Sequence, residues 1–218
     1  MKLNKMIDHT NLKPDATQKD IEKLILEAIK YDFFAICINP SFLLFAKPKL
    51  KHTNIKICCV ASFPFGTTSL EAKLAEIKWL IENGCDEIDF VINVAHVKDN
   101  QFDKIEREFS RIRETTTGHT IKVIIETCFL SKDEIVKVCK IADKCSIDFV
   151  KTSTGFAKGG ATAEDVKLMK ESISSKTSVK ASGGIRTYDD AIKMVNAGAS
   201  RIGTSQGVVI AEHSETNK

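Results

Sequence analysis

Short apolar stretches alternate along the chain with longer stretches in which apolar residues recur every three or four positions. The short stretches are rich in Val, Ile and Phe, as buried strands are, and the longer ones have the period of an amphipathic helix. The predicted strands are Lys5–Asp8, Phe33–Ile38, Ile55–Ala61, Glu87–Asn93, Ile121–Glu126, Phe149–Thr152, Ser178–Ser182 and Arg201–Gly203. The predicted helices are Thr17–Tyr31, Thr68–Asn83, Phe102–Thr115, Ser131–Cys145, Thr162–Ser174, Thr187–Asn196 and Gln206–Glu212.

Local signals support the helix assignment. Thr17 is a candidate side-chain N-cap, and Asp20 follows three residues later. Gly84 is expected to end the helix predicted over Thr68–Asn83. The segment Pro40–Leu50 has the weakest pattern, because Pro48 is expected to interrupt a helix there.

Eight strands that alternate with helices predict an α/β protein, and in particular a single (β/α)8 TIM barrel with parallel strands and right-handed crossovers. A doubly wound open sheet is the alternative, but eight consecutive units are many for that fold. The 218 residues contain no linker, low-complexity tract or charge block. One domain over residues 1–218 is therefore expected, with its active site at the carboxyl ends of the strands.

The composition is that of an ordinary globular protein, with 43% hydrophobic residues, 28% charged residues and a net charge of +3. The basic residues are dispersed, so neither a nucleic-acid partner nor a membrane partner is expected. No apolar run is long enough for a bilayer span, and no secretion signal is expected at the N-terminus. The seven cysteines lack CxxC spacing and the five histidines lack a ligand spacing. This pattern favours free thiols in a cytoplasmic protein without a metal site.

Two lysines stand where lysines are unusual, at the carboxyl ends of two successive predicted strands. Lys151 ends the apolar run of "DFVKTSTGF", and Lys180 lies in "VKASGG". Strand alternation allows both side chains to point into the barrel. It also directs Asp89 inward, because the bulkier Ile88 and Phe90 suit the helix side. A shift of one residue in strand parity would reverse any of these orientations.

A buried lysine is unfavourable unless it is paired or deprotonated, and a second ammonium group nearby increases that cost. The pKa of one lysine is therefore expected to fall towards neutrality. A neutral amine attacks aldehydes and ketones to form a Schiff base, while the second, cationic lysine can donate a proton. Asp89 could hold this cation or relay protons through water. The set predicts carbon–carbon bond cleavage through an enamine; the competing interpretation is that each lysine simply reaches solvent.

Glycine-rich segments follow the last three predicted strands: "GFAKGGAT" at 155–162, "SGGIRT" at 182–187 and "GTSQG" at 203–207. Backbone N–H groups in such loops, together with the following helix N-termini, can bind an anion. Barrels often bind phosphate after strands seven and eight. A phosphorylated substrate is therefore expected, although glycine loops also serve as plain connectors. His9, which follows the first strand, is expected to be a hydrogen-bonding residue near the pocket rather than a metal ligand.

The segments "IDHTNLKPDAT", "AICINP", "FPFGTTS", "DEIDFVIN", "KVIIET", "DFVKTSTGF", "VKASGGIRT" and "RIGTSQG" resemble the deoxyribose-phosphate aldolase family, in order, from Asp8 to Gly207. The resemblance implies a class I aldolase on a (β/α)8 barrel, without metal or organic cofactor. Such an enzyme reversibly cleaves 2-deoxy-D-ribose 5-phosphate to D-glyceraldehyde 3-phosphate and acetaldehyde, in deoxyribose phosphate catabolism. Its implied partners are a phosphosugar and aldehydes, and a homo-oligomer, most simply a dimer, is expected.

By motif, the resemblance implies that Lys151 is the Schiff-base lysine. It implies that Lys180 perturbs this lysine and transfers protons, and that Asp89 is a proton donor and acceptor. The substrate contacts that it implies are Asp8, Cys37, Thr152, Gly155, Gly183, Gly184 and Ser205.

Two positions depart from the family pattern. Gln206 stands where the usual "GTSSG" loop has its second serine, which puts one phosphate hydrogen bond in question, and Lys158 adds a cation to the loop at 155–162. Two other functions stay open. One is a related phosphate-binding barrel, such as a transaldolase-like or isomerase enzyme, which need not have both lysines. The other is a barrel that only binds sugar phosphates and regulates a partner.

Overall fold

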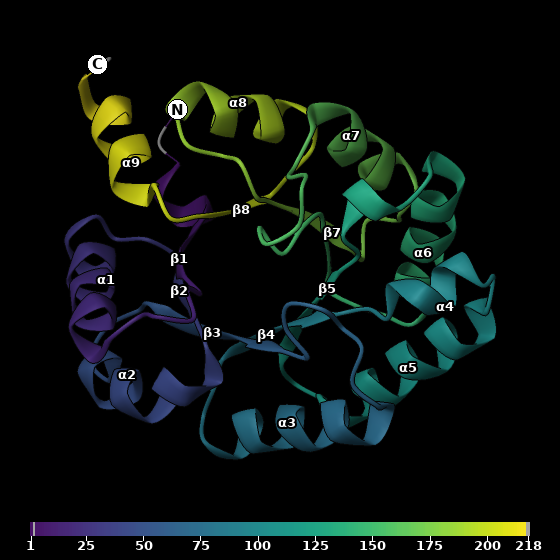
Figure 1. Ribbon diagram of the computed structural model, residues 1–218. Coiled ribbons are helices and arrows are strands. Elements are labelled where there is room, and N and C mark those ends of the chain that lie inside the picture. Colours follow the sequence, from purple (N-terminus) through teal and green to yellow (C-terminus); the bar gives the residue numbers. More distant parts are fainter. Residues whose placement is uncertain (2, 217–218) are drawn as a thin grey trace.

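Within the described residues, which are residue 1 and residues 3–216 of the computed structural model, eight parallel strands close into a barrel surrounded by helices (Figure 1). The strands are β1 Ile7–Asn11, β2 Ala35–Ile38, β3 Lys56–Ala61, β4 Glu87–Val91, β5 Thr120–Ile124, β6 Phe149–Lys151, β7 Ser178–Ser182 and β8 Arg201–Thr204. They pair in chain order, and β8 pairs with β1 to complete the ring. The predicted α/β class and single (β/α)8 barrel are confirmed.

The outer layer consists of the helices between successive strands and of one further helix after β8. The α-helices are α1 Gln18–Lys30, α2 Leu43–Leu50, α3 Leu70–Glu82, α4 Val94–Lys98, α5 Phe102–Thr115, α6 Lys132–Lys144, α7 Ala163–Glu171, α8 Tyr188–Asn196 and α9 Gly207–Thr216. Short 3-10 turns cover Asn4–Met6, Pro40–Phe42 and Thr127–Phe129. In the part of the chain that the structure describes, no helix has the length and apolarity needed to cross a membrane.

The predicted cap of α1 is confirmed. Thr17 Oγ1 accepts a hydrogen bond from the Asp20 N–H at 3.3 Å, and Asp20 Oδ2 accepts one from the Thr17 N–H at 2.8 Å. This reciprocal pair satisfies two N–H groups that the first turn of a helix leaves unpaired. The first residue of α1 is thereby fixed by local sequence alone.

Two local predictions are wrong. The first strand, predicted at Lys5–Asp8, begins at Ile7, because Asn4–Met6 form a 3-10 turn in which the Asn4 side chain donates to the Tyr31 carbonyl at 2.6 Å.

Pro48, expected to interrupt a helix, instead lies inside α2. A proline removes the hydrogen bond to the carbonyl four residues earlier. That residue, Leu44, is 58% exposed, so the loss falls on the solvent side of α2.

The hydrophobic core lies between the barrel wall and the helices. Ile88 and Phe90 of β4 are fully buried in this layer, and the Phe90 ring meets the Phe109 ring of α5 with 5.7 Å between centroids. Burying a side chain of this size contributes about 1.5–3 kcal/mol. Because side chains alternate along a strand, the outward direction of Ile88 and Phe90 turns Asp89 into the barrel, as predicted.

Candidate active site

Charged side chains from several strands meet inside the barrel and form one connected network. Its acidic members are Asp8, Glu87 and Asp89, and its basic members are Lys122, Lys151, Lys180 and Arg201. Each of these residues is at most 6% exposed. The strand register places Asp89 opposite Lys122, and Lys151 opposite Lys180. Buried charges need partners of opposite sign, and the closed barrel supplies them at close range.

The carboxylate of Asp89 is the centre of this network. Its Oδ2 accepts hydrogen bonds from Lys151 Nζ at 2.8 Å and from Lys180 Nζ at 2.7 Å. Its Oδ1 accepts one from Lys122 Nζ at 2.8 Å. Burial alone would raise the pKa of Asp89, but the three ammonium groups hold it well below its usual value. Asp89 is therefore ionised, and it draws both predicted lysines to a single oxygen atom.

Lys180 has a second carboxylate partner. Asp8 accepts a further hydrogen bond from Lys180 Nζ, and it also accepts one from Arg201 Nη1 at 2.9 Å. Burial would lower the pKa of Lys180, but the charges of Asp8 and Asp89 outweigh this effect and raise it. Burial would also lower the pKa of Lys122, but nearby carboxylates, of which Asp89 has the largest effect, raise it well above its usual value. Lys180 and Lys122 therefore keep their protons.

A pocket of about 630 Å³ opens beside this network. Lys151 lies in its lining and is the member of the network that meets both Asp89 and the pocket. Asp89 and Lys180 are fully buried behind it. The other predicted site residues that line the pocket are Gly155, Gly183, Gly184 and Ser205, with Gln206 beside them. The structure thus brings the two lysines, the acid and the glycine loops together at one place.

Three residues predicted to contact substrate are fully buried and have protein partners instead. Asp8 belongs to the charge network. Thr152 Oγ1 donates to the Ser182 carbonyl and accepts from the Ser182 N–H, both at 3.0 Å, which ties β6 to β7. Cys37 on β2 is the register partner of Cys58 on β3. Direct contact of these three side chains with a substrate stays a prediction.

The glycine loops after β6 and β7 touch each other. Gly155, Gly183 and Gly184 have φ values of 86°, 85° and 79°, a conformation that residues with side chains rarely adopt. The Ala161 N–H donates to the Gly183 carbonyl at 2.9 Å. A Cβ atom on Gly160 would lie 2.3 Å from that same oxygen. The two loops therefore form one backbone surface, which can present N–H groups to an anion.

His9 also lines the pocket, and its Nε2 lies 2.7 Å from Glu27 Oε2 of α1. Burial lowers the pKa of His9 although Glu27 opposes this effect, so the ring is a neutral hydrogen-bonding group. The two positions that depart from the family pattern are both exposed; Gln206 lines the pocket, whereas Lys158 lies outside its lining.

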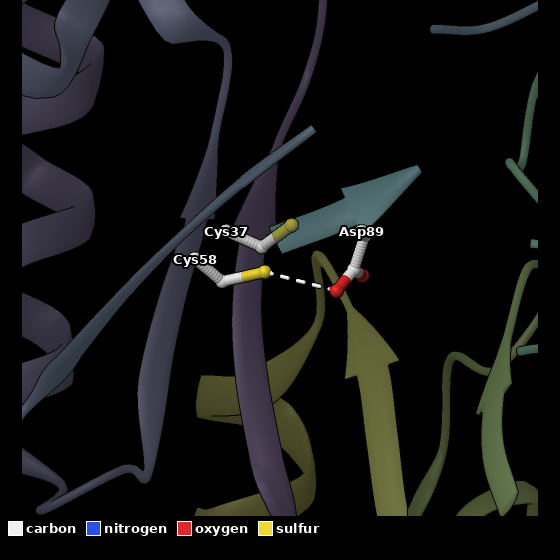
Figure 2. Close-up of side chains that lie close together, drawn as sticks. All are labelled: Cys37, Cys58 and Asp89. Atoms are coloured by element: carbon white, nitrogen blue, oxygen red, sulfur yellow. Dashed lines mark hydrogen bonds between the residues drawn. The ribbon is translucent and has the colours of Figure 1, made fainter. Parts of the chain in front are cut away.

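Figure 2 shows Cys37 and Cys58 beside Asp89, with Cys58 Sγ donating to Asp89 Oδ1 at 3.1 Å. One ligand atom from each of these residues lies within 4.8 Å of the others, a spacing that a metal ion could use. Lys122 Nζ, however, contacts Cys58 Sγ at 3.4 Å and the same Asp89 oxygen. Burial raises the pKa of Cys58 well above its usual value, so this thiol keeps its proton. The cluster is thus poorly suited to a further cation.

Sequence reasoning missed Lys122, Glu87 and Arg201. Lys122 lies in the middle of an apolar strand, between outward-facing isoleucine and valine residues, so the alternation that places Asp89 inside could also have identified it. Glu87 Oε2 lies 2.6 Å from Lys122 Nζ and 3.1 Å from Arg201 Nη1. The contact with Arg201 spans the barrel interior from β4 to β8, and no local pattern encodes it.

The fold and the lysine-lined pocket are those of a barrel aldolase, and comparisons with known proteins agree. A family model described as "DeoC/LacD family aldolase" matches residues 2–212. A deoxyribose-phosphate aldolase from Mycoplasma capricolum is 50% identical over 210 residues, which cover 96% of this chain and 95% of that protein. The chain therefore belongs to the DeoC/LacD family of aldolases.

Solved structures show the same relationship. An aldolase named QR15 is 39% identical and superposes with a TM-score of 0.94, over 99% of this chain and 96% of its own. A deoxyribose phosphate aldolase from Aeropyrum pernix, described as tetrameric, is 30% identical with a TM-score of 0.88, over 99% of this chain and 92% of its own.

Proposed function

We propose that this chain is a class I aldolase that reversibly cleaves 2-deoxy-D-ribose 5-phosphate to D-glyceraldehyde 3-phosphate and acetaldehyde, in deoxyribose phosphate catabolism. The observation that carries the proposal is the place of Lys151: its Nζ lies 2.8 Å from Asp89, and the residue lines the pocket. The name of the Mycoplasma capricolum relative supports the choice of substrate.

The charge balance of the network sets Lys151 apart from the other basic residues. Four basic and three acidic side chains are connected, so full ionisation would leave one positive charge inside the barrel. Lys180, Lys122 and Arg201 each contact two carboxylates, whereas the described residues give Lys151 only Asp89, which it shares. Lys151 is therefore the basic residue of the network with the fewest carboxylate partners, and it lines the pocket.

The reaction begins when Lys151 Nζ attacks the C1 aldehyde of the open-chain sugar, and the resulting carbinolamine loses water to give an iminium ion. The C3 hydroxyl then loses its proton, and the C2–C3 bond breaks as its electron pair moves towards the iminium nitrogen. D-Glyceraldehyde 3-phosphate leaves, and a two-carbon enamine remains on Lys151. Protonation of the enamine at C2, followed by hydrolysis, releases acetaldehyde and returns the free amine.

Lys180 and Asp89 handle the protons of these steps together with a water molecule. Lys180 keeps its proton in the resting site and serves as the donor, because Asp8 and Asp89 raise its pKa. Asp89 is ionised in the resting site and serves first as an acceptor. Positioned proton transfer of this kind typically contributes about 10²–10⁴-fold to the rate.

The glycine loops are the proposed binding site for the phosphate of the substrate. Gly155, Gly183, Gly184 and Ser205 line the same pocket as Lys151, which supports an anion site and a nucleophile within one cavity. The pocket lining also contains the cationic residues Lys13, Lys23 and Arg186 and the acidic residues Asp20 and Glu27. The excess of cationic residues, together with the backbone N–H groups, supports binding of a dianionic phosphate.

Borohydride trapping tests the proposal. Acetaldehyde followed by borohydride should convert Lys151 to an N-ethyl lysine, which peptide mass spectrometry locates. The adduct and the turnover of deoxyribose 5-phosphate should both disappear in Lys151→Ala. They should persist in Lys167→Ala, which changes an exposed lysine of α7. An adduct on a different lysine, or full turnover by Lys151→Ala, would refute the role of Lys151; substrate binding without any adduct would favour a binding module.

The remaining expectations are also proposals. We propose one barrel domain over residues 1–218, of which residues 2, 217 and 218 lie outside the described part of the chain. We propose a cytoplasmic enzyme without cofactor, nucleic-acid partner or membrane partner, in line with its dispersed charge. A homo-oligomer, most simply a dimer, is proposed as well, and the tetramer described for the Aeropyrum pernix protein supports assembly in this family. Analytical ultracentrifugation measures the assembly state directly.

A further inference from the structure

Glu126 follows β5 and has a buried carboxylate that belongs to neither the charge network nor the pocket lining described above. The residue is 3% exposed. Its Oε1 and Oε2 accept hydrogen bonds from the Thr154 N–H at 3.2 and 3.3 Å, and Oε2 also accepts one from Thr154 Oγ1 at 2.5 Å. Both polar groups of Thr154 that can donate are thus directed to one carboxylate.

The backbone of Glu126 is strained in a way that serves this contact. Its φ is 52° and its ψ is 66°, a left-handed conformation that residues other than glycine rarely adopt. The Thr127 N–H donates to the Thr152 carbonyl at 2.9 Å, and the Phe129 N–H donates to the Glu126 carbonyl at 3.0 Å, so the turn is fixed on both sides. Strain of this kind persists where the surrounding structure needs the side chain in one place.

Thr154 in turn fixes the loop that follows the nucleophile. Thr154 Oγ1 accepts a hydrogen bond from the Phe156 N–H at 3.1 Å, and Thr154, Gly155 and Phe156 all line the pocket. The Phe156 ring packs edge-on against Phe63, with 5.3 Å between centroids and 90° between planes. Gly155 lies between the two residues that this chain of contacts holds. The carboxylate of Glu126 therefore sets the position of the Gly155 backbone.

We propose that Glu126 is a positioning residue that holds the Thr154–Phe156 loop against the phosphate end of the substrate, and so sets the preference for phosphorylated over unphosphorylated deoxyribose. The proposal rests on the proposed aldolase function. Glu126 makes its side-chain hydrogen bonds with Thr154 and interacts with Lys151 only through their charges, so its effect on the chemistry at the aldehyde end should be small.

The test measures kcat and KM for 2-deoxyribose 5-phosphate and for 2-deoxyribose in the parent chain and in Glu126→Gly, Glu126→Ala and Glu126→Gln. Glycine removes the carboxylate and also relieves the left-handed strain, so this variant should fold. Alanine shows whether any loss comes from the added freedom of glycine. Glutamine keeps an oxygen acceptor in place. Glu114→Gln, on the outside of α5 with a 71% exposed side chain, is the control.

The glycine and alanine variants should lower kcat/KM for the phosphorylated substrate at least about tenfold, through KM, while kcat/KM for deoxyribose changes less than about threefold. Glu126→Gln should recover most of the preference. All variants should still form the borohydride-stabilised acetaldehyde adduct on Lys151. An unchanged preference in Glu126→Gly and Glu126→Ala, or an equal loss for both substrates, would overturn the role of Glu126. A parent chain without any adduct would instead overturn the aldolase function itself.

Discussion

Lys151 and Lys180 are register partners on β6 and β7, and their Nζ atoms donate to the same oxygen atom, Asp89 Oδ2, at 2.8 and 2.7 Å. A carboxylate oxygen shared in this way neutralises one ammonium group well and two poorly. Because Asp8 supports Lys180 as well, the deficit of negative charge falls on Lys151. Among the lysines of the network, Lys151 thus has the weakest pairing with carboxylates.

Replacing Lys180 should change the pH dependence of catalysis. In Lys180→Leu, the carboxylate of Asp89 has one fewer cation to neutralise, so its charge acts more strongly on the lysines that remain. The rising limb of the kcat/KM profile should move to higher pH, and the rate at neutral pH should fall at least about 100-fold because a proton donor is also lost. A profile of unchanged shape would contradict the charge-sharing argument.

Replacing Asp89 should affect stability as well as activity. Asp89→Asn leaves three buried lysine side chains without their common carboxylate, so the free energy of unfolding should fall by about 3–5 kcal/mol. Urea denaturation measures this loss, and Glu114→Gln should change the same quantity by less than about 0.5 kcal/mol. A loss as small as that of the control would show that water, rather than Asp89, stabilises the lysines.

The network should also shape the dependence of stability on pH. Lys180, Lys122 and Arg201 hold the pKa of Asp8 below its usual value of 3.8 against the effect of burial. A depressed carboxyl pKa stabilises the fold above the unfolded value, and this contribution is lost as pH falls through the folded value. Lys180 and Lys122, with pKa values raised above 10.5, stabilise the fold below that pH and lose the contribution as pH rises further.

The contribution of this network to the unfolding free energy should therefore be nearly constant between these limits and fall at both ends. Asp8→Asn should lower the unfolding free energy near neutral pH. It should also make this free energy less dependent on pH on the acid side, which urea denaturation at a series of pH values would measure. A variant with the acid slope of the parent chain would show that Asp8 does not contribute in this way.

Gln206 offers a change that should improve binding. It lines the pocket where the family pattern has serine, and its N–H already donates to Thr204 Oγ1 at 2.9 Å, a backbone contact that a substitution retains. Gln206→Ser should lower KM for deoxyribose 5-phosphate by about three- to tenfold, as one added hydrogen bond to a charged group would. KM for deoxyribose should stay constant; an equal change for both substrates would place the effect away from the phosphate.

Much of this architecture could be predicted from local sequence. The alternation of apolar runs with helical periods is sufficient for the barrel, and the Thr17–Asp20 pair fixes the start of α1. Strand parity alone turns Lys151, Lys180 and Asp89 inward. These predictions succeed because each depends on residues within a few positions of one another.

The parts that could not be predicted depend on closure of the ring. Arg201 reaches Asp8 and Glu87 only because β8 pairs with β1 and the interior is narrow. The role of Glu126 depends on a left-handed turn that its residue type does not favour, and on a partner 28 positions away. The onset of β1 was displaced by Asn4, whose bond to the Tyr31 carbonyl is also a contact between distant segments.

The close approach of Gly160 to the Gly183 carbonyl has a practical consequence for redesign. The backbones of the loops after β6 and β7 are in direct contact there, so the position of one loop cannot change without the other. A side chain introduced at Gly160 would displace both loops at once. Engineering this end of the barrel for bulkier aldehydes will need paired libraries that vary the two segments together.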